Sequence, residues 1–96
     1  MDIAFDPAKN ARNIRERGLS FERVIDFDFE TAIITTDNRR DYGETRIIAV
    51  GYLDERLHVL CFVEIDTGIR VVSFRKANLR EVNRHGKAQA TDNPVR

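Results

Sequence analysis

The spacing of apolar residues changes along the chain. Up to about residue 30 the apolar positions recur every third or fourth residue, and from residue 31 they recur every second residue. The first period is typical of a helix packed on one side, and the second of a strand. We therefore predict an α+β domain with the element order β-α-α-β-β-β-β-α.

The first predicted elements are a short strand and a helix with clear end signals. Residues 3–5 form an apolar strand candidate. Asp6 can cap the free amides of a helix, and Pro7 suits its first position. We expect this helix to run to about Arg17 and to stop at Gly18, since glycine readily adopts the left-handed conformation found beyond helix ends.

A second helix is predicted after Ser20, which supplies another N-cap. Leu19 and Val24 are spaced as a hydrophobic staple around it. One helical stripe then holds Phe21, Val24, Ile25 and Asp28, with Phe27 close to it.

Four strands with short polar turns are predicted next. The strands are residues 32–36, 45–53, 57–64 and 69–74. A polar turn spans 37–41, and Asp54-Glu55 and Asp66-Thr67-Gly68 have hairpin chemistry. Both faces of the last two strands are apolar, which places them centrally. The prediction is an antiparallel four-stranded sheet plus the short N-terminal strand.

A short C-terminal helix is predicted to begin at Asn78. Glu81 follows three residues later, as in a capping box. After Gly86 the residues are small and polar and include Pro94, so residues 87–96 are expected to form a disordered tail. The predicted single domain is therefore 1–86.

The charge of the chain is zero overall but unevenly spread. Sixteen Lys and Arg balance sixteen Asp and Glu among 96 residues. Residues 20–37 carry five carboxylates against one arginine, whereas residues 70–96 carry seven Lys and Arg against two carboxylates. This asymmetry suggests two different surfaces. No apolar run is long enough to cross a membrane and no signal region is evident, so we expect a cytoplasmic protein.

The cysteine and histidine content does not indicate a metal site. Cys61 is the one cysteine and lies in an apolar stretch, where an inert packed thiol is expected. His58 alternates with apolar strand residues and is expected to be packed, and His85 is far from it in the chain. These spacings are not those of metal ligands, and we predict no metal and no cofactor.

Four cations crowd one predicted strand-to-helix corner. They are Arg70, Arg75, Lys76 and Arg80. A fold of zero net charge does not require such a concentration, whereas a polyanion binder or a phosphodiester-cleaving enzyme does.

Arg75 and Arg70 are the candidates for holding a phosphate, because the guanidinium fork donates two parallel hydrogen bonds. Strict strand alternation places Arg75 with Ser73 on one face and Arg70 with Val72 and Phe74 on the other. The two arginines would then not share a site unless the strand ends near Arg75. An ion pair with a carboxylate such as Glu44 is the alternative for Arg70.

Other candidates each have a structural alternative. Glu44 and Arg46 share a strand face and can form a salt bridge or take part in chemistry. Lys9 lies in the first turn of a helix, where its charge opposes the dipole unless an anion is near. His85 can transfer protons near neutrality or lie idle at a helix end. Glu81 can be a cap or a base.

The predicted site residues fall into two groups. The catalytic candidates are Arg75, Arg70, Lys9, His85 and Glu44. The RNA-binding candidates are Arg46, Ser73, Lys76 and Arg80.

Four stretches of the chain resemble motifs of the BrnT-type toxins. Phe5-Asp-Pro-Ala-Lys-Asn10 resembles F-x-x-x-K, and Gly18-Leu-Ser-Phe-Glu22 resembles H-G-V-S-F-E. Tyr42-Gly-Glu-Thr-Arg46 resembles Y-G-E-x-R, and Arg70-Val-Val-Ser-Phe-Arg-Lys-Ala77 resembles R-I-I-S-A-R-x-A, with Glu81 beyond it. Each motif is short, but the four occur in order at matching spacing from residue 5 to about 86.

The resemblance implies a RelE-like fold and a toxin that cuts RNA, as one half of a type II toxin–antitoxin pair. It also implies a partner, a BrnA-like DNA-binding antitoxin that neutralises the toxin and carries the complex to operator DNA. The sequence departs from the family pattern at Arg17, where a histidine is common, and at His85, where a tyrosine is common. Both departures lie near candidate residues of the site.

Two other classes of function are open at this point. In one, the protein binds RNA without cutting it, which the small number of general bases favours. In the other, it is an interaction module whose acidic region from Glu22 to Asp37 docks a basic partner.

Overall fold

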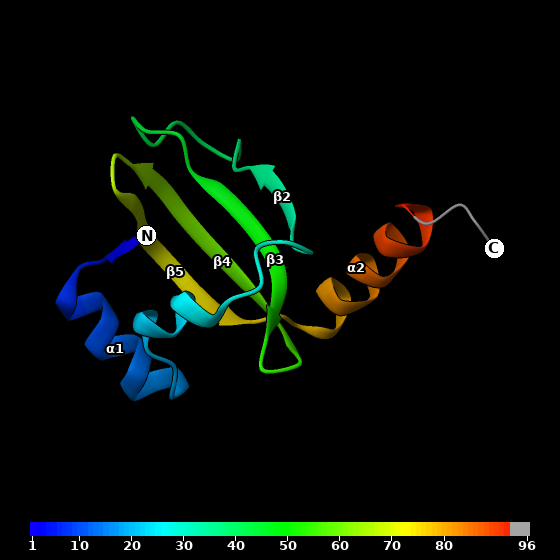
Figure 1. Cartoon of the computed structure of the whole chain (residues 1–96), viewed down its shortest axis with the longest axis horizontal. Helices are drawn as coiled ribbons and strands as arrows, with labels where there is room; N and C mark the ends of the chain where they lie inside the picture. The colour runs from blue at the N-terminus through cyan, green and yellow to red at the C-terminus, as the bar shows by residue number, and fades with distance from the viewer. Residues whose placement is uncertain (93–96) are drawn as a thin grey trace.

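The protein is one mixed β-sheet with helical segments at its two ends. The computed structural model describes the backbone of residues 1–92 and the side chains of residues 1–88. Five strands form the sheet in the order β1-β5-β4-β3-β2 (Figure 1). The strands are β1 (Asp2–Ala4), β2 (Ile33–Thr36), β3 (Ile47–Leu53), β4 (Arg56–Ile65) and β5 (Gly68–Lys76).

The N-terminal strand corrects the expected sheet. β2, β3, β4 and β5 are antiparallel as predicted, but β1 joins the same sheet by pairing parallel with β5. Asp2 lies opposite Gly68, and a Cβ at position 68 would overlap the backbone of Asp2. The glycine after the β4–β5 turn therefore makes room for the first strand.

The first helix, α1 (Pro7–Arg17), has the predicted ends. The Asp6 carboxylate accepts a hydrogen bond from the Ala8 amide at 2.9 Å, and Gly18 takes the left-handed conformation at φ 65°. α1 is fixed to the sheet through Asn13, whose side-chain amide donates to the carbonyl oxygens of Leu19 and Phe74 at 2.9 Å each.

The second predicted helix is a 3₁₀ segment, η1 (Phe21–Asp26). In a 3₁₀ helix side chains three residues apart eclipse one another. Phe21, Val24 and Phe27 have that spacing and are all buried, whereas Ile25, expected on the apolar stripe, is 62% exposed. The tighter winding thus directs three apolar side chains into the core and explains why the predicted α-helical stripe is wrong.

The C-terminal helix, α2 (Leu79–Asp92), begins as expected and is longer than expected. Asn78 and Glu81 exchange the two hydrogen bonds of a capping box, at 2.8 and 2.9 Å. The helix passes through Gly86 and reaches Asp92, so the expected boundary between residues 86 and 87 is not a helix end. Residues 93–96 of the expected tail lie outside the described residues.

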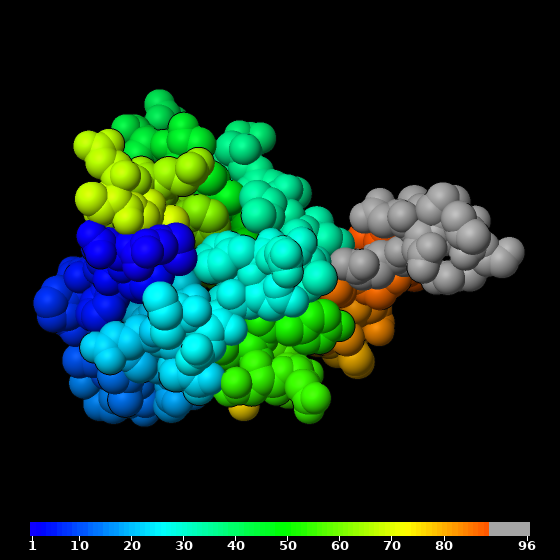
Figure 2. Space-filling model, viewed as in Figure 1, coloured from blue at the N-terminus to red at the C-terminus, as the bar shows by residue number. Residues whose placement is uncertain are grey.

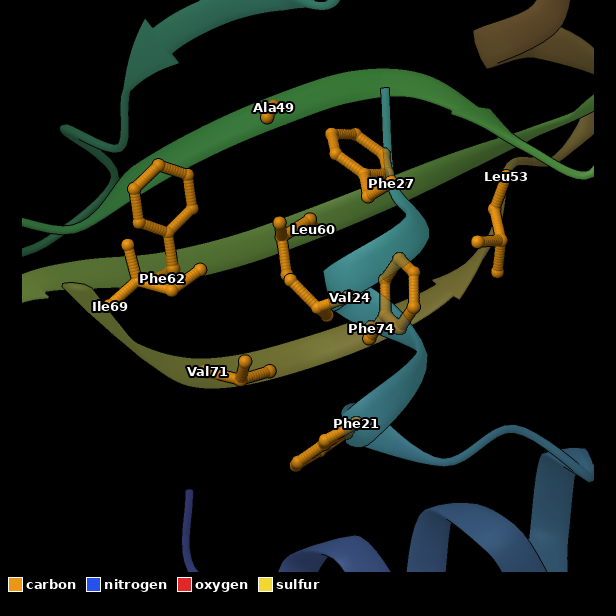
Figure 3. Packing of buried hydrophobic residues seen from close by; sticks show 10 residues of the cluster. All are labelled: Phe21, Val24, Phe27, Ala49, Leu53, Leu60, Phe62, Ile69, Val71 and Phe74. Carbon is orange, nitrogen blue, oxygen red and sulfur yellow. The ribbon is translucent and has the colours of Figure 1, made fainter. Parts of the chain in front are cut away.

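The main hydrophobic core lies on one face of the sheet. All six phenylalanines of the chain contribute to it, and their rings meet edge to face, as between Phe27 and Phe74 at 6.0 Å. Figure 3 shows four of them, Phe21, Phe27, Phe62 and Phe74, among the buried residues of the core. η1 and the segment after it cross this face, while α2 leads away from the end of β5 (Figures 1 and 2). Gly51 allows the crossing, because a Cβ there would lie 2.9 Å from the side chains of Phe27 and Ala32.

The β3–β4 hairpin turn stores backbone strain. Asp54 and Glu55 both have positive φ, 51° and 66°, in a two-residue turn that favours Asn-Gly. We expect Glu55→Gly to raise the free energy of unfolding by about 1 kcal/mol, which is a rise of about 4–8 °C in melting temperature. Thermal unfolding followed by circular dichroism measures it. Glu55→Ala removes the same charge but keeps a Cβ, so it should give no such gain; equal gains would point to charge as the cause.

Candidate functional site

A groove lies on the face of the sheet opposite the phenylalanine core. Its volume is about 640 Å³. Its floor is apolar and comes from the central strands β3 and β4, and its walls come from β2, β5 and α2. The lining residues used below are Ile48, Val50, Val59 and Cys61 on the floor and Arg39, Ser73, Arg75, Glu81, Arg84 and His85 on the walls.

A β-bulge places three predicted site residues on this one face. Cys61 pairs with Ser73, but its neighbour Phe62 pairs with Val71, so Val72 is the extra residue in β5. The extra residue resets the alternation, and Arg70, Ser73 and Arg75 all share the face of Cys61. The expectation that Arg70 faces away from Arg75 is therefore wrong.

Arg75 is held in a fixed orientation by Glu81. Its two terminal nitrogens donate to the two carboxylate oxygens of Glu81 at 2.8 and 2.9 Å. Hydrogen bonding from Arg75, opposed by burial and aided by the Asn78 amide, lowers the pKa of Glu81 to about 2. The same contact raises the pKa of Arg75. Glu81 is thus the predicted cap, and it also orients the Arg75 guanidinium at the N-terminus of α2.

His85 lines the same groove one helical turn beyond Glu81 and is 6% exposed. Its ring meets the edge of Tyr52 with centroids 5.6 Å apart and an interplanar angle of 89°. Nε2 of His85 is buried and has no hydrogen-bond partner among the described residues. Buried polar atoms are nearly always paired in folded proteins, so this nitrogen is a notable exception.

A second group of charges continues from the groove along the same face. Glu44 accepts hydrogen bonds from Arg70 at 2.7 and 2.9 Å and from Arg46 at 3.2 Å. These bonds, that of Arg70 first, lower the pKa of Glu44. Arg46 also stacks over the ring of Tyr42 at 4.0 Å. The ion pairs weighed as alternatives for Arg70 and for Arg46 are therefore present.

Asp37 anchors the near end of this group. It is 6% exposed and receives two hydrogen bonds from the Arg39 side chain at 2.8 Å and one from the Tyr42 hydroxyl at 3.0 Å. The bonds from Arg39 lower the pKa of Asp37 most. Arg39 in turn lines the groove, so the two charge groups are contiguous.

The remaining predicted site residues lie outside the groove. Lys9 is exposed on α1. Lys76 pairs across the strands with His58 and so lies on the core face. Arg80 lines a shallow hollow on the outer side of α2.

Sequence reasoning missed two of the groove's arginines, Arg39 and Arg84. Arg39 lies in a polar turn two residues from its partner Asp37, which is a weak signal. Arg84 follows Glu81 by three residues and precedes Ala88 by four, and all three line the groove with His85. This helical stripe was readable from the sequence.

The other chemical groups of the chain are structural. Burial raises the pKa of the Cys61 thiol, which keeps it protonated and unreactive. His58 is buried against Phe74, and its Nδ1 lies 2.7 Å from the carbonyl oxygen of Arg56. In the described part of the chain no three His, Cys, Asp or Glu side chains form a group able to hold a metal ion. No helix there has the length and apolar composition to cross a membrane.

The groove combines features that suit a phosphodiester. Guanidinium groups from the segment after β2, from β5 and from α2 surround an apolar floor, and an imidazole lies among them. Guanidinium ions bind phosphate oxygens in pairs, and imidazole takes up and releases protons near neutral pH.

Comparison with known proteins identifies one family. The family model described as "Ribonuclease toxin, BrnT, of type II toxin-antitoxin system" matches residues 5–81, which is most of the chain. No curated protein matches. The matched segment contains Arg75 and Glu81, whereas Arg84 and His85 lie beyond its end.

The Arg75–Glu81 pair should make stability depend on pH in the acid range. Glu81→Gln keeps a cap of the same shape but removes the charge. The pKa of Glu81 is about 2 in the folded protein and 4.5 when the group is free. The contribution of its charge to the free energy of unfolding is therefore complete above pH 4.5 and is lost as the pH falls towards 2. We expect E81Q to lower the free energy of unfolding by about 1–2 kcal/mol at pH 7, with the difference vanishing near pH 2.

Urea unfolding at a series of pH values measures this difference. Glu16→Gln is the control, because Glu16 pairs with Arg12 at 3.6 Å on an exposed surface and should contribute less than about 0.5 kcal/mol. A difference between wild type and E81Q that stays constant from pH 7 to pH 2 would rule out the ion pair as its source.

Proposed function

The chain belongs to the BrnT family of type II ribonuclease toxins, and from this membership we propose a metal-independent endoribonuclease that cleaves cellular RNA and so inhibits translation. The observation that supports the proposal best is the position of Arg75. Its guanidinium lies in a groove with Arg39, Arg84 and His85, on an exposed face of the sheet. A RelE-like fold remains part of the proposal.

The proposed reaction is an attack by the ribose 2′-hydroxyl on the adjacent phosphorus. A bond forms from the 2′-oxygen to phosphorus and the bond from phosphorus to the 5′-oxygen breaks. The 2′-hydroxyl gives up its proton, the leaving 5′-oxygen takes one up, and a 2′,3′-cyclic phosphate and a 5′-hydroxyl result. Negative charge builds on the phosphate oxygens, and donors placed there in advance stabilise it. We assign this role to Arg75, with Ser73 beside it.

Glu81 prepares Arg75 for this role. Each terminal nitrogen of Arg75 donates one N–H to Glu81, and Nη1 also donates to the Lys76 carbonyl oxygen at 3.3 Å, so the side chain is already ordered before RNA binds. A phosphate can bind the N–H groups of Arg75 that Glu81 does not use, while Glu81 keeps its bond to the Asn78 amide. Pre-ordering of this kind reduces the entropy lost on binding.

The other candidates have supporting roles in the proposal. His85 is assigned the proton transfer, as the one imidazole among the described side chains that line the groove. Glu44 orients Arg46 and Arg70, which with Arg39, Arg75 and Arg84 we call the cationic face. Lys9 is assigned a general attraction for RNA from α1. Lys76 and Arg80 attract the RNA backbone from outside the groove.

Of the two alternative functions, docking of a basic partner on the acidic region receives less support. Two carboxylates of the acidic region already have partners within the chain. Asp28 accepts hydrogen bonds from the amides of Glu30 and Thr31, and Asp37 accepts two from the Arg39 side chain. Binding of RNA without cleavage fits the same groove. It is separated from the proposal by the cleavage assay below.

The proposed partner is a BrnA-like antitoxin that binds DNA. Membership of a toxin–antitoxin family implies a cognate antitoxin. A disordered segment of the antitoxin that folds on binding could cover the groove. We propose that operator DNA is contacted only through this complex. The proposed location is the cytoplasm, where RNA and antitoxin are made.

The purified protein should cleave single-stranded RNA in the absence of metal ions. Side chains alone supply the phosphate donors in the proposed reaction, so excess EDTA should leave the rate unchanged within about twofold. End-labelled RNA resolved by gel electrophoresis measures it. Arg75→Ala purified in the same way controls for contaminating nuclease, and cleavage that requires Mg²⁺ would contradict the metal-free mechanism.

Arg75→Ala should lower the cleavage rate by about 10²-fold, the usual effect of losing one transition-state donor. Arg75→Lys should fall between wild type and alanine, because an ammonium keeps the charge without the fork. Glu81→Gln is the matched control, since it breaks the same ion pair but retains the guanidinium. We expect it to remain at least about tenfold more active than Arg75→Ala; equal losses would show that Arg75 acts through structure.

A further inference from the structure

The floor of the groove is more apolar than phosphate binding requires. Ile48, Val50 and Val59 present aliphatic side chains beneath the arginines. Val59 belongs to a small second cluster with Leu57 and Ala77, against which Ile48 and Val50 pack, separate from the phenylalanine core. Ile48 and Val50 are half-buried, so part of the floor is open to a ligand.

The orphaned nitrogen of His85 is an independent sign of a ligand. Nε2 is buried and unpartnered among the described residues, and the ring lines the groove. A buried polar atom without a hydrogen bond costs stability. A ligand with polar groups would supply the missing partner at this place.

The residues that line the groove fit one class of ligand. It must have an apolar face for the aliphatic floor, polar atoms for His85, and negative charge for Arg39, Arg75 and Arg84. A nucleotide has all three: a flat base, a ribose with hydroxyl groups, and a phosphate. A groove of about 640 Å³ lies within the usual size range of ligand sites, about 300–1,000 Å³.

We propose that the groove floor over Ile48, Val50 and Val59 binds one unpaired base of the RNA, and that His85 Nε2 hydrogen-bonds the same nucleotide. This inference rests on the proposed function and adds a subsite to it. The base must be unpaired, because a base inside a duplex is stacked and its faces are not free. The subsite would therefore confine cleavage to single-stranded segments.

The test uses RNA that cannot be cut. A ten-nucleotide RNA with 2′-O-methyl groups throughout lacks the attacking hydroxyl, so binding is measured without cleavage. A series of these probes carries one abasic nucleotide at each position in turn, which keeps the phosphates and removes one base. Fluorescence anisotropy gives the dissociation constant of each probe.

For the wild type we expect one position of the series to raise the dissociation constant about tenfold, and the others less than about twofold. Val50→Asn should abolish that position-specific penalty, and Val50→Thr, which keeps the shape of the side chain, should reduce it. Ile34→Asn is the matched control. Ile34 pairs with Ala49, so its side chain is on the core face, and it is 51% exposed; its penalty should equal that of the wild type.

Three outcomes would overturn the subsite. A series in which all positions bind alike shows that no base is held, while the proposed ribonuclease function stands because RNA still binds. A penalty that persists in Val50→Asn places the base elsewhere. If the folded wild type binds no probe at all, the proposed function fails together with the subsite.

Discussion

The ion pair between Arg75 and Glu81 joins the two parts of the molecule on which the site depends. Arg75 ends the apolar run of β5, and Glu81 belongs to the first turn of α2, so the pair fixes where the helix leaves the sheet. The same Glu81 closes the capping box with Asn78. One carboxylate therefore starts the helix, directs it, and holds the arginine that we assign to the phosphate.

The cationic face is built largely from arginines that already have carboxylate partners. Asp37, Glu44 and Glu81 each bind at least one arginine through charged hydrogen bonds. Such pairing permits a high density of guanidinium groups without strong mutual repulsion. It also orients the guanidinium groups, whose remaining N–H donors are then held in place for an incoming anion.

Much of the fold could be predicted because its signals are local. The caps at Asp6 and Ser20, the stop at Gly18 and the capping box at Asn78 each depend on a few neighbouring residues, and all are present. The parallel pairing of β1 could not be predicted, because it joins segments far apart in the chain. The 3₁₀ winding of η1 could not be predicted, because apolar residues three positions apart also fit an α-helix.

The site was predicted in part for the same reason. Arg75, Ser73 and His85 were identified from their positions at the strand-to-helix corner, and the structure brings them to one groove. The bulge at Val72 was invisible, because Val71 and Val72 are both apolar and suit either face of β5. Because the faces of β5 were misassigned, Arg70 was placed on the face opposite Arg75. The position of Arg39 beside the groove could not be predicted, because it depends on the tertiary fold.

The parallel pairing of β1 with β5 also sets when the molecule can become complete during synthesis. The first strand leaves the ribosome early, but its partner residues 68–70 are made only when most of the chain already exists. Glu81 and His85 follow later still. The groove therefore cannot be assembled on a nascent chain that has not yet reached residue 85, although its first strand was made at the start.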